Sequence, residues 1–290
     1  MRSLLFVPGD SERKLEKGLG SGADCLIVDL EDSVAADNKE RARKTATDFL
    51  AARGGSIRVY VRVNDLRSGL IDRDIAAVVP GLPDGIMLPK AEGIADVEQL
   101  SAKLRVAEAV AGLPDGSIAI LPIVTETARG VFLAPSFAAG HQRLAGLTWG
   151  AEDLSAVVGA SVTRDGAGRC TDVFRLARAT TLLAASAAET VAIDTVYVDF
   201  RDEAGLSAEC REAERDGFTG KMAIHPAQIP VMNAIFTPSA EAVAEARRLV
   251  DAFAAAGNPG VLAIDGRMVD RPHLRRAERL LARAGLSEGS

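Results

Sequence analysis

Eight short apolar runs alternate along the chain with amphipathic stretches, and this alternation restricts the fold more than any other feature of the sequence. Such runs are typical of buried strands, while the stretches between them carry Ala, Leu, Arg and Glu at helical spacing. Repeated β-then-α alternation favours a parallel sheet covered by helices, and eight strands close a (β/α)₈, or TIM, barrel. The predicted strands cover residues 4–7, 25–30, 57–63, 85–88, 118–124, 144–149, 191–198 and 220–224.

The stretches between the strands predict helices, of which residues 38–52, 96–111 and 171–188 are the clearest, often preceded by a capping Asp, Asn or Thr. An open doubly wound sheet is the alternative to the barrel. No G-x-G-x-x-G or G-x-x-x-x-G-K-[ST] turn follows a predicted strand, so the sequence marks no dinucleotide or P-loop site. The pattern therefore favours the barrel.

The sequence continues beyond the eighth predicted strand. Two more helices are predicted over residues 239–256 and 271–284, separated by the helix-breaking segment 257–260. We therefore expect a barrel domain over residues 1–236 and a C-terminal helical extension over residues 237–290. The extension is expected to pack on the barrel or on a neighbouring subunit.

Composition excludes several classes of protein. The chain has 290 residues, a net charge of −6 and a pI near 5.3, and it lacks the clustered Lys and Arg of a nucleic-acid-binding protein. No apolar stretch approaches the roughly 20 residues that span a bilayer, and strand-like sequence begins by residue 3, so neither a membrane role nor a leader peptide is expected. Three widely spaced cysteines without a C-x-x-C motif indicate reduced thiols and a cytoplasmic protein.

Two carboxylates, Glu126 and Asp153, follow the fifth and sixth predicted strands. If these strands are neighbours in a barrel, their ends bring both side chains to its catalytic rim. Mg²⁺ is commonly held by one or two carboxylates, with water and substrate completing its shell, so the pair predicts a magnesium site, with Mn²⁺ as the alternative ion. From spacing alone the commoner explanation is that both acids are first-turn residues of helices, because Asp and Glu favour helix N-termini.

An arginine, Arg62, lies within the β-forming segment 59–63. A guanidinium is costly to bury without a partner, so an anion is expected to face it. A structural salt bridge to Asp29, Glu31 or Asp32 and a contact with a substrate carboxylate remain equal alternatives.

Lys90 and His225 also follow predicted strands. Lys90 is a candidate Schiff-base lysine of an aldolase that needs no metal, or a partner of Glu92. His225 is a candidate base, although a single histidine at a strand end is more often a hydrogen-bonding anchor. The other histidines are His141 and His273, and without an H-E-x-x-H motif they do not indicate a zinc site.

Seven motifs in order resemble those of the citrate lyase beta subunit and malyl-CoA lyase family, also called the HpcH/HpaI aldolase family. They are Leu5-Phe-Val-Pro-Gly9, Val28-Asp-Leu-Glu-Asp32 with Lys39 and Arg41-Ala-Arg43 behind it, Val61-Arg-Val-Asn64, Met87-Leu-Pro-Lys90, Pro122-Ile-Val-Thr-Glu126, Gly150-Ala-Glu-Asp-Leu154 and Gly220-Lys-Met-Ala-Ile-His-Pro226. The resemblance implies a TIM barrel that uses Mg²⁺ to cleave or form a C–C bond between an acyl-thioester enolate and a 2-oxo acid.

The resemblance also implies roles for individual residues. Glu126 and Asp153 correspond to metal ligands, and Arg62 to the arginine that faces the oxygen of the oxo acid or thioester. Asp29 and Glu31 complete the predicted substrate-binding set. No residue that contacts coenzyme A is predicted.

The tail segment Ile264-Asp-Gly-Arg-Met-Val-Asp270-Arg-Pro272 resembles the part of CoA-ester lyases whose aspartate reaches into a neighbouring subunit's active site. Asp270 is therefore a candidate catalytic residue, and a homo-oligomer, a trimer or hexamer, is expected. The alternative is that Asp270 is the N-cap of the last helix, with Pro272 in its first turn.

The predicted function is that of a Mg²⁺-dependent C–C lyase acting on a 3-hydroxyacyl-CoA or a related acyl thioester, similar to malyl-, citramalyl- or citryl-CoA. The products would be an acetyl-CoA-like thioester and a 2-oxo acid, and thioesterase activity at the same site remains open. Two alternatives are a Schiff-base aldolase built on Lys90, and a lyase beta subunit that works only with acyl-carrier and transferase partners.

Overall fold

The computed structural model describes residues 1–55, 57–264 and 266–285. The chain forms two compact units, Met1–Asn233 and Ala234–Ser290. Within the described residues, no helix is both long and apolar enough to cross a bilayer.

The first unit is built on eight parallel strands, in the order β5-β4-β3-β2-β1-β8-β7-β6. Parallel bridges between Ile120 and Leu144 and between Ile123 and Thr148 join the two edges of this sheet. The predicted TIM barrel is confirmed. The strands are β1 Ser3–Pro8, β2 Cys25–Asp29, β3 Arg58–Arg62, β4 Gly85–Leu88, β5 Ala119–Pro122, β6 Leu147–Thr148, β7 Ala192–Asp194 and β8 Gly220–Ala223.

Alternate residues along the strands point into the barrel and form a single core cluster. The buried members of this cluster are Leu4, Cys25, Ile27, Tyr60, Met87, Leu121, Ile123, Ile193 and Met222. The residues between them pack outward against the helices, and every residue of β2 is buried. Burial of both faces explains why these strands are nearly continuous apolar runs in the sequence.

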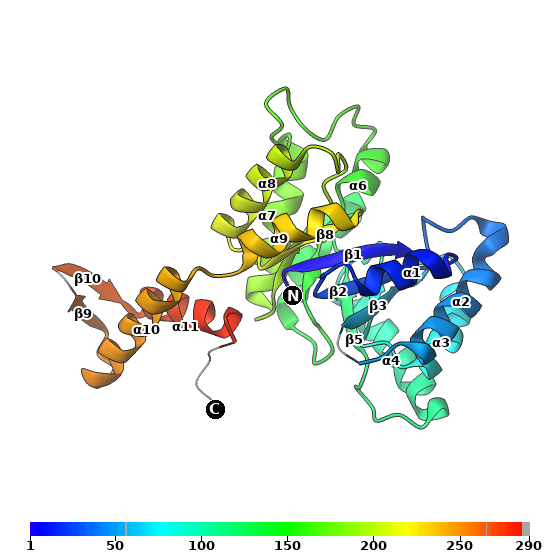
Figure 1. Cartoon of the computed structure of the whole chain (residues 1–290), viewed down its shortest axis with the longest axis horizontal. Coiled ribbons are helices and arrows are strands. Elements are labelled where there is room, and N and C mark those ends of the chain that lie inside the picture. Colours follow the sequence, from blue (N-terminus) through cyan, green and yellow to red (C-terminus); the bar gives the residue numbers. More distant parts are fainter. Residues whose placement is uncertain (56, 265, 286–290) are drawn as a thin grey trace. The chain divides into compact units, whose positions relative to one another are not determined.

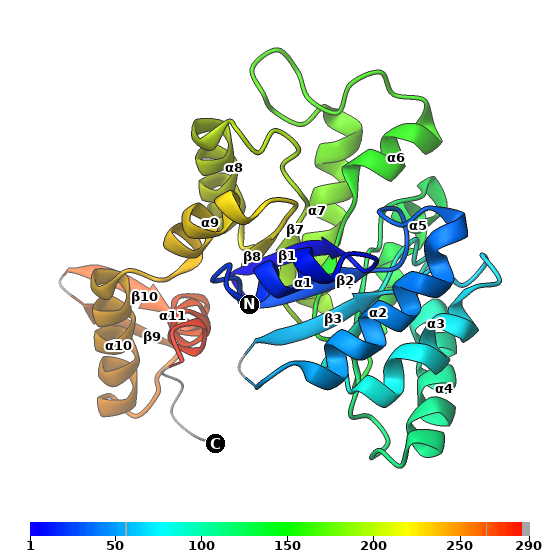
Figure 2. The ribbon, with the colours of Figure 1, turned by 45° about the vertical axis from the view of Figure 1, so that its right-hand side comes forward.

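Helices cover the outside of the barrel, and α2, α3 and α4 lie side by side (Figures 1 and 2). The helices predicted over residues 38–52, 96–111 and 171–188 form as α2, α4 and α7. The helices of this unit are α1 Glu12–Leu19, α2 Lys39–Ala52, α3 Ile71–Val78, α4 Ile94–Ala111, α5 Ala128–Leu133, α6 Ala151–Val158, α7 Asp172–Ala187 and α8 Glu203–Asp216, with short 3₁₀ turns at Ala36–Asn38, Val79–Gly81, Ala134–Ala139 and Pro226–Gln228. Helix α9, Ile229–Phe236, runs from this unit into the next.

Six strands are shorter than predicted, and the sixth and seventh differ most. The sixth covers Leu147–Thr148 instead of residues 144–149, and the seventh covers Ala192–Asp194 instead of residues 191–198. Beyond β7 the chain leaves the sheet, and Thr195 and Val196 line a cavity at the strand ends. These two β-branched side chains form part of the cavity wall, and their segment does not pair in the sheet.

The second unit contains α10 Ala240–Ala255 and α11 Arg271–Arg283, which form from the two helices predicted in the tail. Ala246, Ala277 and Leu281 form the buried contact between these helices. An antiparallel hairpin, β9 Val261–Ile264 and β10 Arg267–Asp270, separates them and was not predicted. Asp-Gly between two apolar runs is a hairpin signal that the sequence analysis missed, although Asp265 itself lies outside the described residues.

Candidate active site

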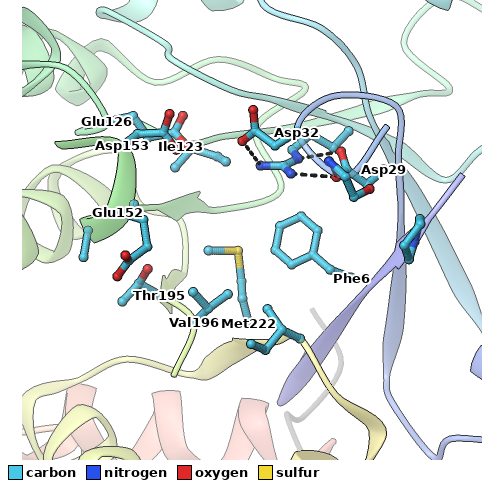
Figure 3. Close-up of a pocket in the computed structure, with 16 residues that line it drawn as sticks. Phe6, Asp29, Asp32, Ile123, Glu126, Glu152, Asp153, Thr195, Val196 and Met222 are labelled. Atoms are coloured by element: carbon cyan, nitrogen blue, oxygen red, sulfur yellow. Dashed lines mark hydrogen bonds and ion pairs between the residues drawn. The ribbon is translucent and has the colours of Figure 1, made fainter. Parts of the chain in front are cut away.

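The carboxyl ends of the strands surround a cavity of about 420 Å³, the place where a TIM barrel carries its active site (Figure 3). Both polar and apolar side chains line it. The lining residues are Phe6, Pro8, Asp29, Asp32, Ser33, Arg62, Ile123, Glu126, Gly150, Ala151, Glu152, Asp153, Thr195, Val196, Met222 and Ile224. Four of the five predicted site residues of the barrel, namely Asp29, Arg62, Glu126 and Asp153, are among them.

The carboxylates of Glu126 and Asp153 lie next to each other in this cavity (Figure 3). Glu126 follows β5 and is 3% exposed, and its Oε2 accepts the main-chain N–H of Lys90 at 2.5 Å. Burial and the neighbouring charge of Asp153 raise the pKa of Glu126 well above its usual value. Two adjacent carboxylates in a buried site are costly unless a cation balances them.

A glycine allows this close arrangement. A Cβ atom on Gly150 would lie 2.7 Å from Cγ and 3.1 Å from Oε1 of Glu126. Any larger residue at the start of α6 would push the Glu126 side chain out of its place. This explains the glycine at the beginning of the Gly150-Ala-Glu-Asp-Leu154 motif.

The helix-terminus interpretation of the two acids holds for only one of them. Asp153 does lie in the first turn of α6. Glu126 precedes α5, whose N-cap is Thr127, with the Thr127 hydroxyl accepting the N–H of Gly130. Glu126 is therefore directed into the cavity and not toward the α5 N-terminus.

The donor set fits a hard divalent cation. The described residues contain no cluster of three or more His, Cys, Asp or Glu side chains that could hold a metal ion, so a closed zinc-type site is not formed. Mg²⁺ needs only one or two carboxylates, because water and substrate oxygens supply its remaining ligands. Glu126 and Asp153 meet this requirement.

Arg62 forms the salt bridge that was one of its two predicted alternatives. Its Nε and Nη2 each lie 2.7 Å from an Asp29 oxygen, and its Nη1 lies 3.1 Å from Glu31 Oε2 and 3.4 Å from Asp32 Oδ2. Burial alone would lower the pKa of Arg62, but its bonds to Asp29 raise it, so the guanidinium stays charged. It also lies over the Phe6 ring, 4.8 Å from its centroid. Arg62 is thus held rigidly while it lines the cavity.

Lys90 pairs with Glu31 and Asp153, and not with Glu92 as one prediction had it. Its ammonium contacts Glu31 and lies 3.3 Å from Asp153 Oδ1, whereas Glu92 accepts hydrogen bonds from Arg67 and Thr127. Burial alone would lower the pKa of Lys90, but Glu31 raises it. A Schiff-base lysine needs a lowered pKa, so this environment does not favour the nucleophilic role.

Glu31 is buried between two cations but does not line the cavity directly. Burial raises the pKa of Glu31 to about 7, in spite of the opposing effects of Arg62 and Lys90. Lys39, whose role the sequence analysis missed, donates to the main-chain oxygens of Leu30 and Glu31 at 2.7 and 2.8 Å. The position of Lys39 behind the Val28–Asp32 motif was the sequence signal that could have identified this role.

The remaining candidate residues lie elsewhere. His225 Nδ1 accepts the N–H of Ala227, and the His225 ring stacks on Phe200 with 4.4 Å between centroids, as expected of a hydrogen-bonding anchor. Asp270, in the second unit, is the N-cap of α11 and accepts the N–H of His273, so its capping interpretation is confirmed.

The sequence did not reveal the apolar wall of the cavity, because inward-facing strand residues look like ordinary core residues in the sequence.

The chain is similar over almost its whole length to proteins named as enzymes of CoA thioesters. A (3S)-malyl-CoA thioesterase from Cereibacter sphaeroides (strain KD131 / KCTC 12085) is 38% identical, over 98% of this chain and 94% of the relative. The mitochondrial citramalyl-CoA lyase of Rattus norvegicus is 35% identical, over 98% of this chain and 86% of the relative.

Solved structures from Mycobacterium tuberculosis are similar as well. The protein CitE in complex with magnesium, acetoacetate and coenzyme A has a TM-score of 0.77 and 38% identity, with 98% of this chain and 100% of that chain covered. CitE with magnesium and pyruvate has a TM-score of 0.73, 34% identity and coverage of 96% and 97%. A citrate lyase beta subunit with oxaloacetate and magnesium has a TM-score of 0.71, 36% identity and coverage of 82% and 97%.

The family model for HpcH/HpaI aldolase/citrate lyase matches residues 2–226, which include every strand of the barrel. This match agrees with the full-length relatives and with the arrangement of Arg62, Glu126 and Asp153 in one cavity. The chain belongs to the HpcH/HpaI aldolase/citrate lyase family.

Proposed function

We propose that the protein is a Mg²⁺-dependent carbon–carbon lyase that cleaves a 3-hydroxyacyl-CoA into an acetyl-CoA-like thioester and a 2-oxo acid. The observation that carries the proposal is the pairing of the buried Glu126, whose pKa is raised, with the half-buried Asp153 in one cavity that Arg62 also lines. Relatives named as a malyl-CoA thioesterase and a citramalyl-CoA lyase, and related structures that hold magnesium, support it.

Each residue has a defined task in this reaction. Glu126 and Asp153 would hold the ion, with Mn²⁺ as a substitute, and the bound ion would supply Lewis-acid polarisation of the oxo-acid oxygens. Arg62 places a fixed positive charge where negative charge develops on the substrate oxygen as the C–C bond breaks. A preorganised donor of this kind contributes a factor of roughly 10²–10³ in rate.

Asp29 and Glu31 act through Arg62 and Lys90 in this scheme. Asp29 occupies two donors of Arg62 and so determines the orientation of the guanidinium plane. Glu31 contacts both cations, and Lys90 in turn contacts Asp153. These two acids are therefore positioning residues of the substrate site, and Lys90 is their link to the metal site.

The enolate released by cleavage needs a proton on its methylene carbon to become the acetyl group. We propose that Asp270 of a second copy of the chain delivers this proton, which requires a homo-oligomer, a trimer or hexamer. The hydroxyl proton of the substrate passes to solvent water as its carbon becomes the carbonyl of the oxo acid, so one proton is released for each proton that the enolate takes up. Free thiols at Cys25, Cys170 and Cys210 support a cytoplasmic location.

A second candidate activity is hydrolysis of the thioester, because one of the relatives is named a thioesterase. Water would attack the thioester carbonyl in the same cavity and release free coenzyme A. The two activities give different products, which makes them separable in one assay.

The proposal is tested with the purified protein, Mg²⁺ and three substrates, malyl-CoA, citramalyl-CoA and citryl-CoA. We expect acetyl-CoA and the matching oxo acid in equal amounts from at least one of them, and loss of turnover in EDTA that added Mg²⁺ restores. Free coenzyme A without oxo acid would identify hydrolysis instead. Turnover that EDTA does not diminish, or no product from any of the three, would refute the proposal.

A further inference from the structure

We infer that the oxo acid of this enzyme is monocarboxylic with an apolar substituent, of the pyruvate type, and that the cavity discriminates against the dicarboxylic oxaloacetate. The inference rests on the proposed function and specifies its substrate. Because both acids occur in the related structures, the choice depends on this chain's own cavity.

The charges around the cavity provide the first argument. Among the described residues that line it, Arg62 is the only cation, whereas Asp29, Asp32, Glu126, Glu152 and Asp153 are acids. A metal ion held by Glu126 and Asp153 would bind the carboxylate that every 2-oxo acid carries. The second carboxylate of oxaloacetate would meet Asp32 or Glu152 without a cation of its own.

Arg62 is not available to that second carboxylate, because the proposed function already places its charge against the reacting oxygen of the substrate. Two of its donor nitrogens are bound to Asp29, and the third lies near Glu31 and Asp32. The Lys90 ammonium is paired with Glu31 and Asp153, and Lys90 does not line the cavity. Binding a second substrate carboxylate would therefore require breaking an existing ion pair.

The uncharged wall provides the second argument. Phe6, Ile123, Val196, Met222 and Ile224 line the cavity. In Figure 3, Phe6, Met222 and Ile123 border the space between the Glu126–Asp153 pair and the Asp29–Asp32 pair. A methyl group gains from contact with such a wall, whereas a carboxylate loses hydration there without a replacement partner.

The size of the effect follows from the same physics. A difference of one methylene between two substrates changes the rate by roughly 10–200-fold. A charged group of the substrate that finds no partner in the site should be rejected more strongly than that. We therefore expect kcat/KM for citramalyl-CoA, which yields pyruvate, to exceed that for citryl-CoA, which yields oxaloacetate, by at least about 100-fold.

A designed cation checks the electrostatic origin of this preference. Val196 lines the cavity in the segment beyond β7, outside the strand pairing. The variant Val196→Lys adds an ammonium there, and we expect it to raise the citryl-to-citramalyl ratio of kcat/KM at least about tenfold. The matched variant Val196→Met adds similar length without charge and should leave the ratio within about threefold of wild type.

The outcomes separate the inference from the proposed function. Cleavage of citramalyl-CoA with little or no cleavage of citryl-CoA by wild type supports the inference. Wild-type kcat/KM values within about threefold of each other overturn the inference but leave the lyase function standing. Failure to cleave any of the thioesters overturns the proposed function itself. The ratio of the two kcat/KM values of the wild-type enzyme tests the inference even if neither Val196 variant folds.

Discussion

The main-chain N–H of Lys90 donates to Glu126 Oε2 at 2.5 Å. Lys90 adopts a left-handed conformation with φ of +53°, which is uncommon for a non-glycine residue and is often found at functional sites. The same residue places its ammonium 3.3 Å from Asp153 Oδ1. One strained residue at the end of β4 therefore contacts both carboxylates of the proposed metal site.

Removing either carboxylate should abolish Mg²⁺-dependent turnover while the protein still folds. We expect Glu126→Gln and Asp153→Asn to lose magnesium uptake in calorimetry and at least about 10³-fold in kcat. Because burial raises the pKa of Glu126 well above its usual value, the neutral Gln should not lower the free energy of unfolding of the metal-free protein. Urea titration measures this.

The matched control for these variants is Asp172→Asn. Asp172 is also a first-turn acid, at the start of α7, but it is exposed. Its loss should change neither magnesium uptake nor turnover. Full activity of Glu126→Gln or Asp153→Asn in the presence of EDTA would contradict the proposed metal site.

Substitution of Arg62 should lower both the free energy of unfolding and kcat. Arg62→Met leaves Asp29 buried without its partner, and breaking a buried ion pair in this way costs about 3–5 kcal/mol of unfolding free energy. Arg62→Lys keeps the charge but cannot make the two parallel bonds to Asp29, so kcat should fall roughly 10²–10³-fold.

Arg41→Met is the surface control, since Arg41 makes an exposed ion pair with Asp10. Exposed pairs of this kind contribute about 0–1 kcal/mol. If Arg62→Met is no less stable than Arg41→Met in urea, the buried Arg62–Asp29 pair does not have the structural role assigned to it.

Glu31 should make stability depend on pH near neutrality. Its pKa is raised from 4.5 to about 7 in the folded protein, so the folded state binds the proton more tightly than the unfolded state. The stability that this provides is fully present below about pH 4.5 and is lost as the pH rises through about 7, a change of roughly 3 kcal/mol.

The test compares wild type with Glu31→Gln, which cannot titrate, in the metal-free state. The unfolding free energy of wild type minus that of the variant should decrease between about pH 5 and 8. The slope of this difference is the readout, because the variant also loses its ion pairs with Arg62 and Lys90. A flat or rising difference would show that Glu31 is ionised throughout this range.

Asp270 has a confirmed capping role and a proposed catalytic one, and a single substitution separates them. Asn serves as an N-cap about as well as Asp, so Asp270→Asn should keep α11 and the thermal midpoint. It cannot carry the proton, so kcat should fall by roughly 10²–10⁴-fold.

Subunit mixing then tests whether Asp270 acts on another copy of the chain. Neither Asp270→Asn nor Glu126→Gln homo-oligomers should be active. Unfolding and refolding them together should restore part of the activity, because some sites combine an intact Glu126 with an intact Asp270 from another subunit. If the mixture remains as inactive as its components, Asp270 does not act across subunits.

The sequence alone was sufficient for the barrel and for the location of its site. Alternating apolar runs and amphipathic helices are local patterns, and both the strand number and the parallel arrangement follow from them. Glu126 and Asp153 could be paired because neighbouring strands of a parallel barrel end at the same rim. The hairpin at Val261–Asp270 was missed although its local signal was present.

The tertiary structure decided which groups touch and how they are charged. Lys90 pairs with Glu31, a residue 59 positions away. No rule based on sequence spacing could have selected this distant partner over the nearby Glu92. The pKa of Glu31 and the apolar wall formed by Phe6, Ile123 and Met222 likewise depend on what surrounds each side chain. Local order is encoded by neighbours in the chain, whereas burial, ion pairing and cavity shape arise only when distant segments pack together.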